Sequence, residues 1–577
     1  MMIKPFYFLL NSLLILLYRR ESLLFNKSFS YVSETQEKVL FKILKANKNS
    51  EFGKKYNFFS IKTIKDFQLK VPLLTYNSYL PYIESILEGK KNILTSEPVL
   101  IFALSSGSTA PTKYIPYTCR LKKEFRRAIA PWICDLYLKK NRLFFGSSYW
   151  SISPVTSKNK ISRGGIPIGF EDDREYFGLF EKLLLKHLLV IPKEVCEIKD
   201  IENFRYVTLL FLLKAKDLRF ISVWSPTFLT ILLKSLLEWL PLLINDIEKG
   251  TISLPSSINP EVKNKLLKRF SRHIRRAKEI RNIFLQYQKR EFRGLICEKI
   301  WPNLVMISCW TDGNSALYLK ELKSYLPNVE VQSKGLLSTE GVVSFPLVNE
   351  VGCILSIRSH FFEFIEVDNV PERNNLKLAH QLEKGKRYSV VITTSGGLYR
   401  YKLQDVIEVT GFKRQCPLVR FISKEDKISD LFGEKLNEYH IAEILNKLLK
   451  KYSFSPSFSL LAPERDNGRY SYVLFLSLDE DEKRRIGIGR LIKFRDQLEE
   501  GLAENYHYKY CRELGQLLKV RIFLVKDNAV DIYNNVYRSR GYREGDIKIS
   551  VIDSKDGWVE KFRGTFLNER ETIGHIA

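Results

Sequence analysis

Leu-Ser-Ser-Gly-Ser-Thr-Ala-Pro-Thr-Lys-Tyr-Ile-Pro-Tyr-Thr, residues 104–118, is the stretch around which the rest of this chain is organised. It follows a short apolar run at residues 99–103 that is typical of a buried strand. Small and hydroxyl residues let backbone N–H groups approach an anion closely, and a lysine nearby supplies a positive charge for phosphate oxygens. The stretch therefore predicts a phosphate-binding loop made of Ser105, Ser106, Gly107, Ser108, Thr109 and Lys113. The alternative is a surface turn, since the spacing of a Walker loop is absent.

The composition is that of a large globular protein. The chain has 577 residues, of which 45% are hydrophobic and 13% aromatic, which suffices for two or more domains. Its eight cysteines and seven histidines are scattered without a CxxC or HExxH pattern, so we expect a reduced cytosolic protein without a zinc site. A formal net charge of +27 suits a nucleotide, a nucleic acid or an anionic membrane, without choosing among them.

The N-terminus carries a mostly apolar run with basic flanks. Residues 6–18 lie between Lys4 and the pair Arg19-Arg20, and they are too few for a spanning helix, which needs about 20 apolar residues. No small-residue cleavage site follows, which disfavours a signal peptide. We therefore expect residues 1–20 to form a helix that docks on the protein or on a membrane surface, with a true anchor or signal as the alternative.

The middle of the chain alternates strands and helices, which predicts an α/β core. We expect strands at 303–309, 329–335, 352–357 and 361–367, a helix near 313–326, and three more strands within 387–423. After Phe421 a charged stretch leads to a long helix at 434–451. The sequence thus predicts a large domain at 1–425, a hinge at 424–430 and a smaller α+β domain at 431–577.

Two further motifs lie downstream of the expected phosphate loop. Ser338-Thr339-Glu340-Gly341 follows an expected strand, and a carboxylate placed there suits Mg²⁺ bound to a nucleotide. Residues 393–405 read Thr-Thr-Ser-Gly-Gly-Leu-Tyr-Arg-Tyr-Lys-Leu-Gln-Asp, a strand and a glycine turn that end on one aspartate. Asp405 can accept hydrogen bonds from ribose hydroxyls, as acidic residues do in dinucleotide folds. The alternative for this string is a plain β-hairpin.

Two helical segments and one late lysine complete the pattern. After Ser225-Pro226 the chain is almost continuously apolar, which predicts a buried helix with Ser225 as its N-cap. The basic run at 261–293 has no aromatic stacking platform, so we expect a solvated helix face and no nucleic-acid partner. Lys548 alternates with Ile547 and Ile549 on an expected strand, where periodicity alone makes it a surface lysine.

Taken in order, these motifs resemble the adenylate-forming superfamily of acyl-CoA synthetases and luciferases. More closely, the chain resembles the Gretchen Hagen family of auxin-responsive acyl-acid amido synthetases, including its bacterial-type members. The resemblance consists of short motifs that follow one another in the family's order over about residues 30–550. The string 393–412 is its most specific part. Shorter matches are Val71-Pro72-Leu73, Ile115-Pro116-Tyr117-Thr118, Trp224-Ser225-Pro226-Thr227 and Leu514-Gly515-Gln516-Leu517.

The resemblance implies a fold and an activity. The fold would be a large domain of β-sheets with flanking helices and a β-barrel-like part, followed by a mobile C-terminal domain. The activity would be that of a cytoplasmic ligase that uses ATP and Mg²⁺ to adenylate a carboxylic acid and then conjugates it to an amine, in this family an amino acid. Two alternatives stay open, a ligase that ends in a thioester and a non-catalytic membrane-surface or nucleic-acid-binding protein on this scaffold.

The resemblance also implies roles for single residues. The ATP phosphate loop would be the six residues from Ser105 to Lys113 named above, Ser338 and Thr339 would lie along the adenosine phosphate, and Glu340 would help to hold Mg²⁺. Tyr401 would flank the nucleotide, Asp405 would bind the ribose, Lys424 would lie at the hinge, and Lys548 would reach the α-phosphate. Trp224, Thr227 and Phe228 would line the acyl pocket. Three positions depart from the family pattern: Ala110 and Gln404 replace glycines, and Leu336 replaces an aromatic residue near adenine.

Overall fold

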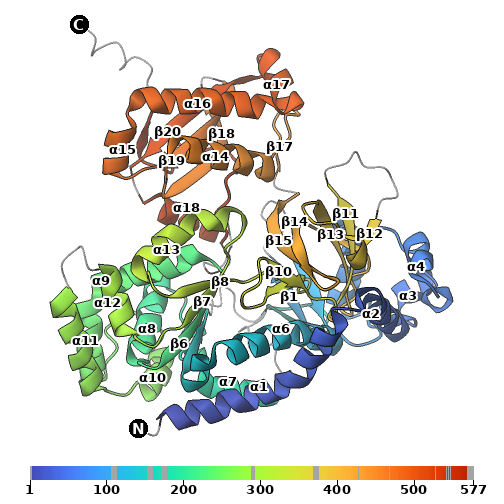
Figure 1. Ribbon diagram of the computed structural model, residues 1–577, viewed down its shortest axis with the longest axis horizontal. Helices are drawn as coiled ribbons and strands as arrows, with labels where there is room; N and C mark the ends of the chain where they lie inside the picture. Colours follow the sequence, from blue (N-terminus) through green and yellow to red (C-terminus); the bar gives the residue numbers. More distant parts are fainter. Residues whose placement is uncertain are drawn as a thin grey trace. The chain divides into compact units, whose positions relative to one another are not determined.

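The computed structural model divides the chain into two compact units (Figure 1). It describes residues 3–105, 113–151, 160–169, 179–287, 293–367, 376–425, 428–466 and 468–567, apart from 527, 541, 543, 544 and 546. Unit 1 comprises Met1–Thr311 and Leu322–Phe421, and unit 2 comprises Asp312–Glu321 and Ile422–Ala577. The hinge at 424–430 and the mobility of the C-terminal part stay predictions.

A parallel sheet forms one half of unit 1. Its order is β3-β6-β7-β8, built from Ser147–Trp150, Leu218–Ser222, Met306–Cys309 and Glu330–Ser333. All three neighbouring pairs run parallel, so the four strands end at the same edge. Every residue of β6 and β7 is buried, as expected of parallel strands covered on both faces. The sequence correctly predicted strands in the regions of β7 and β8.

The helices of this half include the predicted buried one. They are α8 (Ile201–Lys214), α9 (Pro226–Lys249), α10 (Pro260–Arg269), α11 (Ile274–Tyr287) and α12 (Arg293–Ile300). The Ser225 side chain caps α9 and Gly250 ends it in a left-handed conformation, φ 77°. Among the described helices, α9 alone is long and apolar enough to cross a membrane, and 67% of that stretch is buried within the protein.

An antiparallel sheet of seven strands forms the other half of unit 1. Its order is β12-β11-β13-β14-β15-β10-β9, built from Leu376–Leu378, Phe361–Glu366, Arg387–Thr393, Tyr401–Lys413, Cys416–Lys424, Cys353–Leu355 and Ser344–Pro346. The three strands expected within 387–423 are confirmed as β13, β14 and β15. Beside this sheet lies a smaller one of order β2-β1-β5-β4, built from Lys113–Tyr117, Ile101–Ser105, Pro167–Ile168 and Lys160–Ile161.

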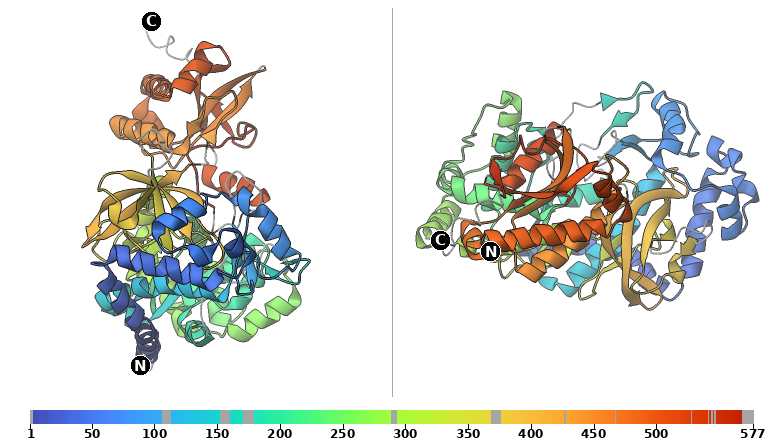
Figure 2. Two further views of the ribbon diagram at one scale, coloured as in Figure 1. Left: turned by 90° about the vertical axis from the view of Figure 1, so that its right-hand side faces the viewer. Right: turned by 90° about the horizontal axis from the view of Figure 1, so that it is seen from above.

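N-terminal helices pack around these sheets. They are α1 (Ile3–Ser28), α2 (Val32–Asn47), α3 (Glu51–Lys55), α4 (Ile64–Lys70), α5 (Tyr76–Leu87), α6 (Cys119–Lys139) and α7 (Leu179–Leu188). Figures 1 and 2 show α1 running along α6, which it contacts together with α7 and the 3-10 turn η2 (Asn141–Phe145). The expected N-terminal helix is present as α1, and it packs on the protein. The membrane surface, the other contact expected for this segment, stays a prediction.

Unit 2 is a sheet with helices on both faces. The strands β18 (Phe458–Asp466), β19 (Arg469–Ser477), β20 (Leu517–Val525) and β21 (Gly564–Phe566) lie in that order. One face packs against α14 (Glu438–Tyr452), α16 (Ile488–Ala503) and α17 (Tyr506–Glu513), which lie on one side of the sheet in Figure 2. The other face packs against α18 (Ala529–Ser539), Trp558 and Tyr318 of η6 (Gly313–Tyr318).

The expected strand around Lys548 is wrong. Residues 547–550 form no regular strand, although Ile547 and Ile549 are buried and Lys548 between them is half-buried, as the alternation predicted. The two isoleucines pack into the core beside α18, so the alternation of burial comes from that packing. Further along the chain, Ile552 forms a single parallel β-bridge with Leu461 of β18.

A buried ion pair joins the start of β14 to β11. The Arg400 guanidinium donates from Nε and Nη2 to the two Glu363 carboxylate oxygens, both at 3.0 Å, and both side chains are almost completely buried. Its Nη1 donates to the backbone oxygens of Gln68 at 2.7 Å and Val71 at 2.6 Å. Arg400 thus fixes the end of α4 and the residue after it against the seven-stranded sheet.

We expect Glu363→Ala to lower the free energy of unfolding by about 3–5 kcal/mol, because it leaves the buried Arg400 charge uncompensated. Glu408→Ala is the matched control, since it removes the exposed pair with Arg420 on the same sheet and should cost less than about 1 kcal/mol. Urea unfolding of both variants measures the two losses. Equal losses would contradict the prediction.

Candidate active site

The expected phosphate loop connects two paired strands. β1 and β2 pair antiparallel with Ser105 opposite Lys113, so the loop returns the chain directly on itself. Ser106, Gly107, Ser108, Thr109 and Ala110 lie outside the described residues, as does the side chain of Ser105. Lys113 is described, and its Nζ lies 5.7 Å from the centre of the Tyr76 ring. The loop's role in binding phosphate stays a prediction.

A β-bulge places Asp405. In the pairing of β13 with β14, Val391 lies opposite Lys402 but Ser389 lies opposite Val406, so β14 has extra residues between them. Gln404 within this bulge has φ 62°, in the left-handed region that costs a non-glycine residue roughly 1–2 kcal/mol. The bulge re-aims the neighbouring side chain, and Asp405 is buried there. Gln404 thus replaces the glycine of the family pattern at a position where glycine would adopt the backbone conformation without strain.

The turn at 338–341 meets both β2 and β14. Its shape is fixed by Ser338, whose Oγ donates to the Gly341 oxygen at 3.0 Å and accepts from the Gly341 N–H at 3.2 Å. The Tyr117 hydroxyl of β2 donates to the Thr339 oxygen at 2.5 Å. The Tyr401 hydroxyl of β14 lies 3.5 Å from Glu340 Oε1, a long hydrogen bond. The structure therefore brings the second and third sequence motifs together.

Two phenols line this meeting point, that of the buried Tyr401 and that of the half-buried Tyr76. Burial, with a further contribution from the negative charge of Glu340, raises the pKa of Tyr76 to about 12. Burial likewise raises the pKa of Tyr401 far above its usual range, helped by Glu340, Tyr76 and Asp405. Both hydroxyls therefore keep their protons at neutral pH. Tyr76 also accepts the N–H of Tyr114 at 2.7 Å, which anchors β2 just after Lys113.

A buried chain of hydrogen bonds links the turn at 338–341 to the glycine turn at 394–397. The N–H of Val342 donates to His360 Nε2 at 3.2 Å, so the ring proton resides on Nδ1, which faces Glu124 Oε2 at 3.2 Å. Glu124 also accepts the N–H of Ser395 at 3.0 Å and its hydroxyl at 2.5 Å. A Cβ at Gly341 would come within 2.6 Å of Ile392 Cδ1 and 3.0 Å of His360 Nε2, so a larger residue there would have to displace these side chains.

Tyr76, Glu124 and His360 also belong to this site, and none of them was predicted from the sequence. One signal for Glu124 was available, because it is an acid on the apolar face of α6, between the buried Leu121 and Ala128. His360 and Tyr76 carried no signal in the sequence, since their roles depend on partners far away along the chain.

The expected acyl-pocket residues lie where β6 leads into α9. The Trp224 ring packs 5.6 Å from that of Trp310, and Lys334 Nζ lies 4.8 Å from the Trp224 ring centre. This is the carboxyl edge of the parallel sheet, where α/β folds commonly bind ligands. Thr227 and Phe228 are buried in the first turn of α9, and Thr227 shares a 2.6 Å hydrogen bond with the capping Ser225. A pocket role for the three stays a prediction.

The remaining site residues lie in unit 2. Lys424 ends β15, and the backbone oxygen of Lys548 accepts a long hydrogen bond from the Tyr533 hydroxyl at 3.5 Å. Ser550, two residues later, contacts Glu438 at the start of α14. The roles predicted for both lysines at the nucleotide stay predictions.

One buried carboxylate of unit 1 would suit a magnesium ion that a nucleotide brings with it. Within the described ranges, no group of three or more His, Cys, Asp or Glu side chains is placed to hold a metal ion. Mg²⁺ in nucleotide sites is typically bound by one or two carboxylates together with phosphate oxygens. Glu340, buried beside Tyr401, supplies one such carboxylate.

Comparisons with known proteins identify related sequences. Three family profiles match in order: the GH3 family N-terminal domain at residues 23–331, its central domain at 353–424 and its C-terminal domain at 439–555. Indole-3-acetic acid-amido synthetase GH3.2 of Arabidopsis thaliana is 26% identical over 444 residues, covering 72% of this chain and 78% of that protein. The probable indole-3-acetic acid-amido synthetase GH3.11 of Oryza sativa subsp. japonica is 27% identical over 547 residues, covering 88% and 89%.

A solved structure is also similar. The GH3.15 acyl acid amido synthetase superposes with a TM-score of 0.78 at 20% identity, covering 92% of this chain and 94% of that one. At this level of identity the likeness shows a shared fold.

We expect Gln404→Gly to raise the free energy of unfolding by about 1 kcal/mol, because glycine adopts φ 62° without steric cost. Lys402→Gly in the same strand is the matched control, and it should lower stability by about 0.5–1 kcal/mol through backbone entropy. Urea denaturation reads out both variants. A loss of stability in Gln404→Gly equal to that in the control would refute the assignment of strain.

Proposed function

The chain belongs to the GH3 family, and on this basis we propose that it is an ATP-dependent ligase that adenylates a carboxylic acid and conjugates it to an amino acid. The proposal also rests on unit 1, where β2 with Lys113, the turn with Glu340 and the bulge with Asp405 converge. Homologues in this family are acid–amino acid ligases. The convergence of these three motifs is the single observation that carries the proposal.

The first step forms an acyl-adenylate. A carboxylate oxygen of the acid attacks the α-phosphorus of ATP in line, a new P–O bond forms, and the bond to pyrophosphate breaks. The chain contributes position and charge: Lys113 faces the phosphates, Ser338 and Thr339 lie along them, and Asp405 accepts the ribose hydroxyls. Mg²⁺ held by Glu340 would neutralise phosphate charge. The Tyr401 phenol lies beside this carboxylate, and the phenols of Tyr401 and Tyr76 both keep their protons.

The second step transfers the acyl group. The amine nitrogen attacks the activated carbonyl, the C–N bond forms, AMP leaves with the electron pair of the broken C–O bond, and the amine gives up a proton. We propose that unit 2 carries Lys548 to the α-phosphate in the first step and turns about residues 424–430 before the second. A thioester product is the alternative, and the mass of the product distinguishes the two.

We propose that the substrate acid carries an apolar group next to its carboxylate. Relatives are named for indole-3-acetic acid, and in this chain Trp224 pairs with Trp310 at the carboxyl edge of the parallel sheet. An aromatic or aliphatic carboxylate suits such a surface. We further propose that the protein is cytoplasmic. The eight cysteines, all free, support a reducing compartment.

We expect carboxylate-dependent exchange of pyrophosphate into ATP with at least one acid from a panel of aromatic, fatty and jasmonate-like acids. Lys113→Ala should lower the exchange rate about a hundred- to a thousandfold, because it removes a charge that faces the transition state. Lys90→Ala, at an exposed lysine of the same unit, is the control and should keep the rate. Exchange that persists in Lys113→Ala would refute the phosphate-loop assignment, and a protein that binds no ATP would refute the function.

For Lys548→Ala we expect a similar loss of exchange while the dissociation constant for ATP stays within about twofold, since the other residues predicted to bind the nucleotide, apart from Lys424, lie in unit 1. Lys555→Ala, at an exposed lysine of the same unit, serves as the control. Exchange rates and equilibrium ATP binding separate the two effects. Unchanged turnover in Lys548→Ala would remove this lysine from the mechanism.

A further inference from the structure

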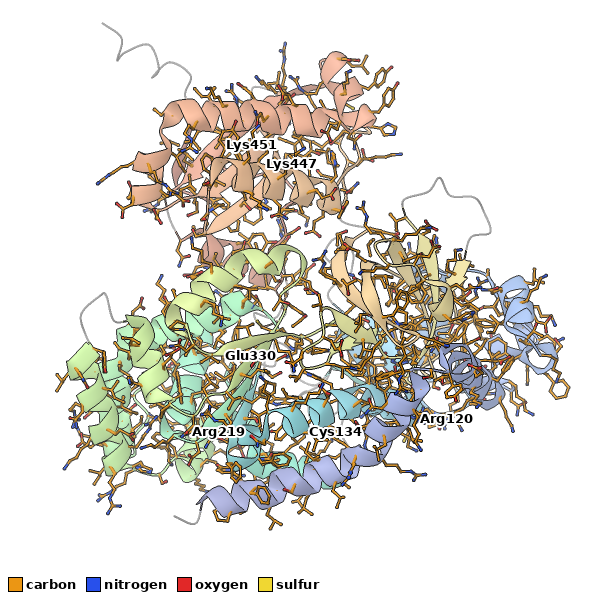
Figure 3. The ribbon with its side chains drawn as sticks, viewed as in Figure 1. Arg120, Cys134, Arg219, Glu330, Lys447 and Lys451 are labelled. Atoms are coloured by element: carbon orange, nitrogen blue, oxygen red, sulfur yellow. The ribbon has the colours of Figure 1, made fainter. Side chains whose placement is uncertain are left out.

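Helix α1 packs on the protein by one side only. Leu14, Ile15, Tyr18 and Phe25 on that side are buried in the core of unit 1. Asn11 donates from Nδ2 to the backbone oxygens of Phe144 and Gly146, at 3.0 and 3.1 Å. Figure 3 shows α1 beside α6, which carries the buried Cys134. The helix is therefore held to the domain along its length.

The opposite side of α1 is apolar and exposed. Leu9, Leu16 and Leu23 are 58%, 65% and 52% exposed and follow one another at intervals of seven residues, so they form one line along the helix. Exposed apolar side chains flank this line, namely Phe6, Phe8, Leu17 and Leu24. An apolar surface of this kind on a soluble domain marks a contact with another molecule or a membrane.

The apolar surface continues onto neighbouring elements. The Phe8 ring stacks on that of Phe145 in η2, with centres 5.3 Å apart and an angle of 22° between the planes. Phe145 is itself exposed, and so is Leu183 of the adjacent α7. The surface is thus wider than one helix. We call it the α1 face, consisting of the exposed apolar residues of α1 together with Phe145 and Leu183.

Positive charges border the α1 face. Arg19, Arg20 and Lys27 are exposed on α1, and Arg142 and Lys186 are exposed on η2 and α7. Among the residues that the structure describes, none of these five cations pairs with an acidic side chain. The single acid of α1, Glu21, is already paired with Arg358, through Nε at 2.7 Å. The border of the α1 face is therefore cationic.

We propose that the α1 face binds the surface of an anionic lipid bilayer. Helices with an apolar face and basic flanks lie in the plane of the membrane, with the apolar side about 5–10 Å deep. The chain cannot span the bilayer through α1, because the other side of this helix belongs to the protein core. A second copy of the chain is a poorer occupant, since each copy has a net charge of +27 and like charges repel.

This inference is independent of the proposed chemistry, so it is tested on the full chain without ATP. The probe is cosedimentation with phosphatidylcholine vesicles that contain or lack phosphatidylserine. The protein should bind the anionic vesicles, and added salt should weaken the binding. The triple variant Leu9→Glu, Leu16→Glu, Leu23→Glu should lose at least tenfold in partition.

The matched control changes three exposed leucines elsewhere in unit 1, Leu69→Glu, Leu242→Glu and Leu285→Glu. It adds the same negative charge and should bind anionic vesicles at least tenfold better than the first variant. A second variant, Arg19→Ala, Arg20→Ala, Lys27→Ala, removes no packed side chain and keeps the test valid if the leucine variant misfolds. Its partition should fall by about fivefold per cation, the factor that corresponds to about 1 kcal/mol.

Three outcomes would overturn the proposal. The first is that the unmodified protein fails to sediment with anionic vesicles at low salt. The second is that the leucine variant on α1 and its control lose binding equally, which would assign the effect to net charge. The third is a concentration-dependent dimer in sedimentation velocity that only the α1 variant abolishes, which would make a second copy the occupant. If the protein binds anionic vesicles but shows no pyrophosphate exchange, the proposed ligase function is contradicted and the membrane proposal is not.

Discussion

One buried carboxylate, that of Glu124, organises the candidate site. It accepts hydrogen bonds from Ser395 and faces the Nδ1–H of His360, whose other nitrogen accepts from Val342. A buried charge is tolerated only when its oxygens are satisfied, so each partner is constrained by the others. The turn that carries Glu340 and the strand that carries Tyr401 and Asp405 are therefore held in one arrangement before any substrate arrives. Preorganisation of this kind is what an enzyme needs when its work is to position phosphates and neutralise their charge.

The sequence allowed much of the local structure to be predicted, because local structure depends on neighbours along the chain. The buried helix α9 was foreseen from its apolar run and its Ser-Pro start, and β13 to β15 from their strand pattern. The Glu124 network could not be foreseen, since its partners are 236 and 271 residues away. The bulge at Gln404 could not be predicted for a related reason. Two extra residues in one strand of a pair do not change the alternation of apolar and polar residues within that strand. At Lys548 the alternation was real, but helix packing produced it and strand pairing did not.

Two motifs that the family resemblance singles out lie close together in the folded chain. Resemblance drew attention to motifs far apart in the sequence, and the hydrogen bonds of Tyr117 and Tyr401 then joined two of them in space. The structure also gives a physical meaning to one departure from the family pattern, since Gln404 has a backbone conformation that favours glycine. Leu336, the other departure within the described residues, is buried in the core of unit 1, where an apolar side chain is well accommodated.

Unit 2 is not contiguous in the chain, and this limits how such proteins can exchange parts during evolution. The Tyr318 side chain, contributed by residues 312–321, is buried in the same core as Phe458, Phe475 and Trp558. A recombination event that transferred only residues 422–577 to another chain would leave a cavity as large as a tyrosine side chain, unless the recipient supplied its own equivalent. Vacating a buried aromatic side chain costs about 3–5 kcal/mol, a large part of the stability of a typical domain. The core of the C-terminal part therefore depends on this short upstream segment.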